Sequence, residues 1–367
     1  MKRTLILAAI LAAAAVAAFS VFGGRKAPPK PGDILWKARV GYVKRGPVVF
    51  DGRVYFLKFD PFTVRGHTLW GKAEYVRAAE ARTGRREWSV TPDGPAFSGP
   101  VAGDDTGVFA DRLAVHAVSK TTGAEKWRHP IQPFSQGVVY FLAIVGQTVY
   151  FGCGDGLHAL AAETGNERWV FAEAPMQDSQ VVVASGVVLF LDGDGTVYAL
   201  DEATGAEKRR FASEKSDYTT SSAAGPDYLA VGNKDSLFAY DLTTAKELWR
   251  SQGDKHTQIR LACADGTVYF GDERMNLRAL DARTGRSIWT TAVPGGFNWR
   301  PVICAGTVYV FTDNNVLVAL DAKTGRENWR TALPDQAVSD LAAGEGIVAV
   351  NLNDGYLYVF MASPPHD

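Results

Sequence analysis

A single phrase recurs along this chain at nearly constant spacing, and it constrains the fold more than any other feature. It approximates G-x-V-Y-F, a polar turn, and then x-L-x-A-L-D-x-x-T-G-x-E-x-W. The best copies are TVYALDEATGAEKRR (196–210), NLRALDARTGRSIWT (276–290) and VLVALDAKTGRENWR (316–330), and weaker copies lie upstream. Such self-similarity indicates stacked supersecondary units of one kind.

The residue that closes each copy gives the period. The closing series is Trp36, Trp88, Trp127, Trp169, Arg209, Trp249, Trp289 and Trp329. Its intervals are 52, 39 and 42 residues, followed by four of 40. Each unit contains too many short alternating apolar segments to be a helix pair, so the pattern favours four short strands per unit.

The motif also has a mechanical interpretation. A strand runs into a turn in which an Asp bonds the backbone two residues on and a Gly takes a positive φ. The next strand presents a Trp, whose surface of roughly 150–250 Å² is large enough to fill the wedge between two sheets. We therefore expect the closing series to dock each unit on its neighbour. Three departures should loosen docking locally, namely Arg209 for Trp, Ala245 for Gly, and Ser119-Lys120 for Leu-Asp.

The two ends of the repeat region complement each other. The chain opens it with a lone last strand, DILWKARV (33–40), and closes it with three strands that lack the final phrase, VSDLAAGEGIVAVNLNDGYLYVFMA (338–362). Joined, they complete one unit and remove the open sheet edges that invite aggregation. The sequence therefore predicts an all-β, monomeric, eight-bladed β-propeller of four-stranded antiparallel blades over residues 33–361, with a tail over 362–367.

The N-terminus predicts export. Lys2 and Arg3 precede an apolar run over residues 5–22, so residues 1–22 are expected to be a helical signal peptide or membrane anchor. At 18 residues, the run is long for the apolar part of a signal peptide and short for a membrane span, which needs about 20 residues. Cleavage and retention are therefore both open. Residues 23–32 form a proline-rich linker without a Cys for lipid modification. We expect a periplasmic or other extracytoplasmic location.

The bulk composition excludes some partners and sites. A net charge of −1, from 39 basic and 40 acidic residues, argues against nucleic acid. Cys153, Cys263 and Cys304 form neither a CxxC pair nor an even disulfide framework, which favours buried strand thiols, with one disulfide still possible. The segment 192–195 (DGDG) lacks the spaced ligands of an EF-hand and suits a hairpin turn.

The histidines add no site to this interpretation. They form no HxxxH or HExxH pair and are expected to be ordinary strand or surface residues. The six are His67, His116, His129, His158, His256 and His366. The sequence accordingly assigns no catalytic, cofactor-binding or metal residue, and no cofactor is expected.

The repeat resembles the pyrroloquinoline-quinone (PQQ)-like propeller family, because T-G precedes the closing Trp. WD40 repeats, which have a similar length, require a Trp followed by Asp, and no Trp in this chain is followed by Asp. The resemblance covers nearly everything after residue 32. That family contains quinoprotein dehydrogenases, outer-membrane assembly factors of the BamB type, and sensor or kinase-linked propellers. Its dehydrogenases stack the quinone between a Trp and an adjacent Cys-Cys disulfide and hold calcium or a lanthanide through acidic side chains. This chain has no Cys-Cys pair.

These observations favour a non-catalytic scaffold that binds a protein partner in the cell envelope, similar in role to BamB. The alternatives are a quinoprotein-type enzyme or small-ligand binder that uses the central channel, and a sensor ectodomain on an uncleaved helix. The segment 59–74 (FDPFTVRGHTLWGKAE) adds about 12 residues to the first interval. Its Phe62, Arg65, His67 and Trp70 are typical of interface anchors, whereas an extra hairpin that only caps the ring is the other interpretation.

Overall fold

The computed structural model places the ring within residues 31–367, which form one compact unit. No helix among the described residues has the length and hydropathy needed to span a membrane. The expected signal or anchor segment and the last five residues of the tail lie outside the described part of the chain. The structure describes residues 28–41, 43, 45–59, 62–64, 67–69, 73–94, 96–131, 139, 141–173, 181–192, 196–212, 221–232, 236–242, 244, 246–252, 260–297 and 299–362.

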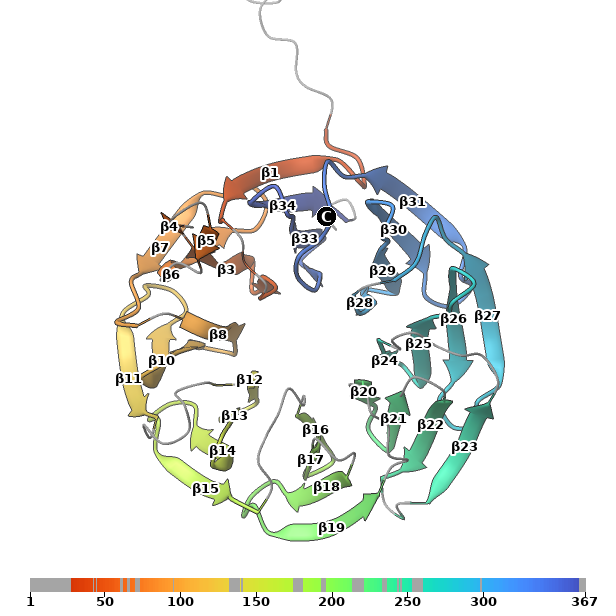
Figure 1. Cartoon of the computed structure of the whole chain (residues 1–367), viewed down its shortest axis with the longest axis horizontal. Coiled ribbons are helices and arrows are strands. Elements are labelled where there is room, and N and C mark those ends of the chain that lie inside the picture. The colour runs from red at the N-terminus through yellow and green to blue at the C-terminus, as the bar shows by residue number, and fades with distance from the viewer. Residues whose placement is uncertain are drawn as a thin grey trace, which may run out of the picture. The chain divides into compact units, whose positions relative to one another are not determined.

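Eight four-stranded antiparallel sheets stand around a common axis, as Figure 1 shows, and confirm the predicted eight-bladed propeller. Blade 1 comprises β2 (Val48–Phe50), β3 (Arg53–Phe59), β6 (Ala73–Glu80) and β7 (Arg86–Val90). Blade 2 comprises β8 (Ala96–Ala102), β9 (Thr106–Asp111), β10 (Ala114–Ser119) and β11 (Glu125–Pro130). Blade 3 comprises β12 (Phe141–Val145), β13 (Thr148–Cys153), β14 (Gly156–Ala161) and β15 (Glu167–Phe171).

The next four blades repeat this arrangement in chain order. Blade 4 comprises β16 (Val182–Ala184), β17 (Val187–Leu191), β18 (Thr196–Asp201) and β19 (Glu207–Ala212). Blade 5 comprises β20 (Ser221–Ala224), β21 (Tyr228–Gly232), β22 (Ser236–Asp241) and β23 (Glu247–Gln252). Blade 6 comprises β24 (Ala262–Ala264), β25 (Thr267–Gly271), β26 (Asn276–Asp281) and β27 (Ser287–Ala292). Blade 7 comprises β28 (Val302–Cys304), β29 (Thr307–Phe311), β30 (Val316–Asp321) and β31 (Glu327–Ala332).

Blade 8 is built from both ends of the repeat region, as the sequence predicts. Its strands are β32 (Ala342–Gly344), β33 (Ile347–Asn351), β34 (Tyr356–Met361) and β1 (Ile34–Arg39). β1 pairs antiparallel with β34, and Trp36 lies opposite Val359. In Figure 1, β1 is the outermost strand of this blade and lies beside β34. The N-terminal strand thus clasps the ring.

The burial pattern along a blade follows from this radial arrangement. Middle strands such as β9 and β13 are buried throughout, because neighbouring blades cover both of their faces. The outer strands β11 and β27 are mostly exposed, and each buries only its tryptophan, Trp127 or Trp289. The hydrophobic core is therefore divided into clusters, most of which combine residues of adjacent blades.

The closing series occupies equivalent positions in all eight blades. In blades 1 to 7 the residue lies opposite the small Ala of the A-L-D phrase, for example Trp169 opposite Ala159, and a register shift follows at once. In blade 8, Val359 takes the place of that Ala. Each of the seven indole N–H groups donates to a backbone carbonyl of the next blade, at 2.7 to 3.3 Å. Trp127, for instance, donates to the Ala162 carbonyl at 2.8 Å.

The T-G turn supplies the surface on which each indole rests. In blade 4, the Asp201 carboxylate accepts hydrogen bonds from the Thr204 backbone N–H and hydroxyl, which fixes the turn. Gly205 then adopts φ 71°, and a Cβ atom there would lie 2.5 Å from Cδ2 of Trp169. Glycine is needed at this position both for its backbone conformation and for the space the indole takes.

Candidate functional site

The first candidate is the insertion in blade 1, which forms an additional hairpin. Its strands β4 (Phe62–Val64) and β5 (His67–Leu69) pair only with each other. β3 pairs directly with β6 across the insertion, with Phe59 opposite Ala73, so blade 1 is complete without it. Arg65 and Trp70 lie outside the described residues, and the side chains of Phe62 and His67 are not among those described. The predicted anchor residues therefore remain a proposal.

The second candidate is a hollow among the inner strands, with a volume of about 450 Å³. Residues at the inner ends of five consecutive blades, from blade 4 to blade 8, line it. Most are small or aliphatic, and the charged ones are Arg300 and Asp340. Burial lowers the pKa of Arg300; the nearby Asp340 carboxylate opposes this effect and the charge of Arg260 adds to it. The hollow is thus an apolar ring interrupted by one cation and one carboxylate.

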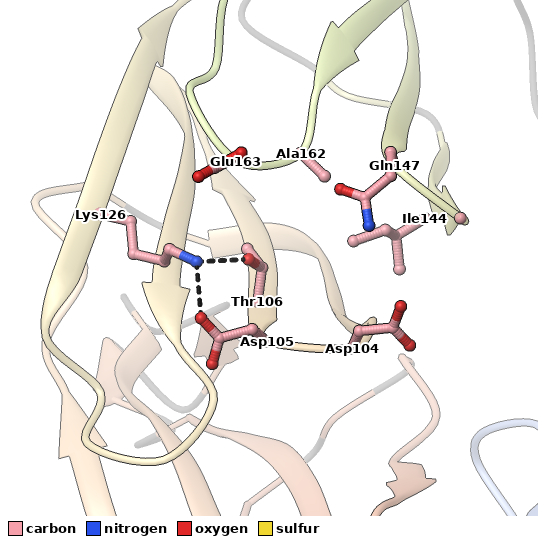
Figure 2. Close-up of a pocket in the computed structure, with 9 residues that line it drawn as sticks. Asp104, Asp105, Thr106, Lys126, Ile144, Gln147, Ala162 and Glu163 are labelled. Atoms are coloured by element: carbon pink, nitrogen blue, oxygen red, sulfur yellow. Dashed lines mark hydrogen bonds and ion pairs between the residues drawn. The ribbon is translucent and has the colours of Figure 1, made fainter.

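The third candidate is a pocket of about 180 Å³ between blades 2 and 3. Figure 2 shows Asp104, Asp105 and Lys126 on one side of it and Glu163 on the other. The Lys126 Nζ atom lies 3.0 Å from a carboxylate oxygen of Asp105 and donates a hydrogen bond to Thr106 Oγ1 at 3.1 Å. The lysine charge is matched within its own blade. A surface ion pair of this kind contributes little energy and assigns no ligand.

The fourth candidate lies at the turn between β13 and β14 in blade 3. The Cys153 thiol donates to Asp155 Oδ1 at 2.8 Å, and His158 Nε2 lies 3.1 Å from the same oxygen. Within the described part of the chain, these three side chains form the one group of three or more potential metal ligands whose donor atoms lie within 4.8 Å of one another. A cavity of about 230 Å³, also lined by His129 and Glu167, adjoins them.

The electrostatics of this cluster follow from its burial. Burial raises the pKa of the Cys153 thiol, and the neighbouring Asp155 carboxylate raises it further. Burial also acts to raise the pKa of Asp155, but hydrogen bonds from Cys153 and His158 outweigh it and hold that pKa below its ordinary value. The thiol is therefore protonated at neutral pH and is a poor nucleophile.

The sequence interpretation missed this cluster. All three cysteines are free thiols, in agreement with the absence of a disulfide framework. The signal that was available is the phrase Cys-x-Asp-x-x-His over residues 153–158, which crosses a two-residue turn. Because the turn folds the chain back on itself, it brings Cys153 and His158 together from adjacent strands.

Comparison with known proteins identifies the family. A family profile described as outer membrane protein assembly factor BamB matches residues 26–136, 111–259 and 273–363. These segments cover nearly the whole ring. This chain belongs to the BamB family. The outcome agrees with the resemblance drawn from the T-G-x-E-x-W phrase.

Solved structures share the fold of this BamB-family chain at low sequence identity. BamB from Moraxella catarrhalis has a TM-score of 0.67 and 17% identity, with 91% of this chain and 99% of that chain covered. A europium-containing methanol dehydrogenase has a TM-score of 0.67 and 13% identity, with 90% and 93% covered. At these identities the likeness shows the fold alone, and the fold does not choose between a scaffold and an enzyme.

One curated relative is a protein kinase. The serine/threonine-protein kinase AfsK of Streptomyces griseus is 34% identical over 158 residues, which make up 40% of this chain. The match covers only 19% of the kinase, so this BamB-family chain corresponds to a small part of it.

The described residues of the central hollow do not fit a quinone cofactor. The family's dehydrogenases use an adjacent disulfide and several acidic ligands, whereas this hollow presents one carboxylate, Asp340, among mostly small and aliphatic side chains. The free thiols Cys153, Cys263 and Cys304 lie in blades 3, 6 and 7. No step of a quinone-dependent reaction can be assigned to these residues.

Proposed function

We propose that this chain is an exported, non-catalytic scaffold that presents its propeller to a protein partner in the cell envelope. The observation that carries the proposal is the BamB-family match, which spans nearly all of the ring. The basic and apolar N-terminal segment supports export, to the periplasm or another extracytoplasmic site, with or without retention of the anchor. The resulting role is similar to that of BamB.

The blade 1 insertion is the proposed contact surface. It is the one place where the repeat breaks its period by about 12 residues, and long ordered loops in compact folds are often functional. Because β3 and β6 pair across it, the hairpin is an addition to a complete blade rather than a part of the core. Phe62, Arg65, His67 and Trp70 provide the aromatic and cationic side chains that dominate protein interfaces.

Trp70→Ala tests this surface. Truncation of an interface hot spot costs about 2 kcal/mol or more, which corresponds to roughly a 30-fold loss of affinity. We expect the variant to lose partners that the wild-type chain captures from envelope extract, as measured by mass spectrometry, while its melting temperature changes little. Replacing residues 60–72 with a short turn should give the same result, because both β3 and β6 are retained.

The matched control is Ile288→Ala, which truncates a side chain that is 48% exposed on the outer strand of blade 6. It should leave capture and stability unchanged. Intact capture by Trp70→Ala together with a lowered melting temperature would show that the tryptophan packs on the ring instead, as large-to-small changes of packed residues do.

A small-ligand binder that uses the central hollow is the second candidate. The presence of Arg300 and Asp340 in a mostly apolar hollow favours it, since few polar groups in an apolar cavity are typical of ligand sites. Retention of the N-terminal anchor would make such a binder a sensor ectodomain. Arg300→Met would then abolish ligand binding while leaving partner capture intact, so the two candidates are separable.

A further inference from the structure

The turn between β13 and β14 brings three different ligand chemistries together. Cys153 offers a sulfur, Asp155 an oxygen and His158 a nitrogen, with Oδ1 of Asp155 in contact with the other two atoms at 2.8 and 3.1 Å. In a tetrahedral zinc site, ligand atoms at about 2.0 to 2.3 Å from the metal lie about 3.3 to 3.5 Å apart. To admit an ion, the Cys153–Asp155 pair would need to open by about 0.7 Å and the His158–Asp155 pair by about 0.2 Å. All three donor atoms already lie within 4.8 Å of one another.

The surroundings of His158 match those of a metal-bound imidazole. The side chain is nine-tenths buried, and its Nδ1 atom has no hydrogen-bond partner. Glu167 Oε2 lies 3.5 Å from that Nδ1 atom. Metal-ligating histidines typically donate their second ring N–H to a carboxylate, which fixes the tautomer and aims the other nitrogen at the metal. Glu167 is placed for this role, with Nε2 turned toward the cluster. In blade 2, Glu125 Oε2 lies 3.6 Å from His116 Nδ1, so what sets blade 3 apart is the thiol and the exposed carboxylate on the Nε2 side.

Blade 2 shows what an ordinary buried His–Asp pair looks like in the same position. Asp111 and Cys153 are the last residues of equivalent strands, and His116 and His158 occupy equivalent places in the strands that follow. Asp111 is fully buried and also accepts hydrogen bonds from backbone N–H groups of Gly94, Leu113 and Ala114. Its lone pairs are therefore committed to the protein backbone.

In blade 3, Cys153 occupies the position of the buried Asp111, and the carboxylate near the histidine is that of Asp155 in the turn. The Asp155 side chain is 44% exposed, and the cavity of about 230 Å³ opens beside it. We propose that Cys153, Asp155 and His158 form a binding site for a divalent transition-metal ion of the Zn²⁺ class, with one coordination position open to this cavity. On binding, the sulfur–metal bond forms and the thiol proton passes to solvent.

The mixed ligand set determines the class of ion. Magnesium and calcium require oxygen ligands, whereas a sulfur and an imidazole nitrogen together select Zn²⁺ and related ions such as Co²⁺. Three protein ligands with a fourth position open to water also follow the pattern of accessible rather than purely structural zinc sites. His129 also lines this cavity.

Cobalt binding tests the site directly. The full chain, purified without a histidine tag and treated with chelator, is titrated with Co²⁺. We expect one equivalent to produce a thiolate-to-cobalt charge-transfer band in the near ultraviolet, which excess Zn²⁺ removes. Cys153→Ser should abolish the band, and Asp155→Asn and His158→Gln should each weaken Co²⁺ binding by at least tenfold.

Matched controls make the test specific. Cys263→Ser, Cys304→Ser and His116→Gln should retain the band, because these residues lie outside the cluster. Cys153→Ser or His158→Gln could unfold the blade, because both side chains are buried. The Asp155 side chain is partly exposed, so Asp155→Asn should fold and still test the site. The proposal is overturned if the wild-type chain gives no band or if the band survives Cys153→Ser. It is also overturned if Asp155→Asn, folded by circular dichroism, binds Co²⁺ as tightly as wild type.

Discussion

At six interfaces between blades, a tryptophan rests on the glycine of the next blade's T-G turn. A Cβ atom on that glycine would lie 2.5 to 2.9 Å from the indole, closer than real contacts allow. The blade 4 to blade 5 interface departs from this pattern at both positions. Arg209 stands in the tryptophan slot, and the T-G phrase that follows it in the chain contains Ala245. We interpret the two departures as one compensated change, because a slot without an indole leaves room for a Cβ atom at the glycine position.

This pairing predicts a coupled response. Arg209→Trp alone should not stabilise the protein. At the six intact interfaces a Cβ atom at the glycine position would collide with the indole, and Ala245 carries that atom. Combined with Ala245→Gly it should raise the free energy of unfolding, with a coupling energy of about 1 to 3 kcal/mol between the two changes. Urea unfolding of both single variants and the double variant measures the coupling, and strictly additive effects would contradict it.

Gly205→Ala is the matched control at an intact interface. It should destabilise the protein, because its Cβ atom would meet Trp169 at 2.5 Å and the backbone there has φ 71°. The sequence could not reveal this partnership. It showed that tryptophans and glycines recur, but the residues that touch lie some 36 positions apart and in different blades.

At the scale of elements, the single strand β1 closes the ring by completing blade 8. It covers the outer edge of β34 through five registered pairs, from Ile34 opposite Phe360 to Arg39 opposite Tyr356. Deleting residues 33–40 should uncover that edge and cause self-association, as unprotected sheet edges do. Size-exclusion chromatography with light scattering checks this.

Deletion of residues 60–72 provides the comparison, because that change leaves every four-stranded sheet paired and should yield a monomer. A monomeric, stable protein lacking residues 33–40 would count against the clasp. The blade boundaries were predictable because each strand repeats a local pattern with period two. The closure was predictable because the single strand at the start and the three strands at the end form a complete blade only when they are joined.

The Cys153 cluster was not predictable in the same way. Motifs such as HExxH place two ligands on one face of a helix, but in a β-hairpin two ligands approach each other across a turn. The phrase Cys-x-Asp-x-x-His becomes meaningful only when the register of β13 and β14 places Cys153 opposite Gly156. In a propeller, different ligand types can therefore meet across a strand-turn-strand phrase.

At the scale of the whole molecule, the described residues of the central hollow lead us to expect no quinone cofactor. After incubation with pyrroloquinoline quinone and calcium or a lanthanide, followed by gel filtration, we expect no quinone absorbance in the protein fraction and no dye-linked alcohol oxidation. The physical reason is that the described lining of the hollow offers one carboxylate, Asp340, and that the three cysteines are free thiols. A quinoprotein dehydrogenase handled in parallel is the positive control. Stoichiometric quinone binding with alcohol oxidation would replace the scaffold proposal with an enzyme.

The clasp also determines where the chain ends lie. The Gly32 N–H donates to the Met361 carbonyl at 2.8 Å, and the Met361 N–H donates to the Asp33 carbonyl at 2.9 Å. The first and last residues of the ring are thus adjacent. The eight blades form a closed cycle, so their arrangement does not depend on the blade at which the chain begins. A few residues are enough to link 362 to 32, and new termini placed in any exposed loop between blades would then produce a circular permutant with the same eight sheets.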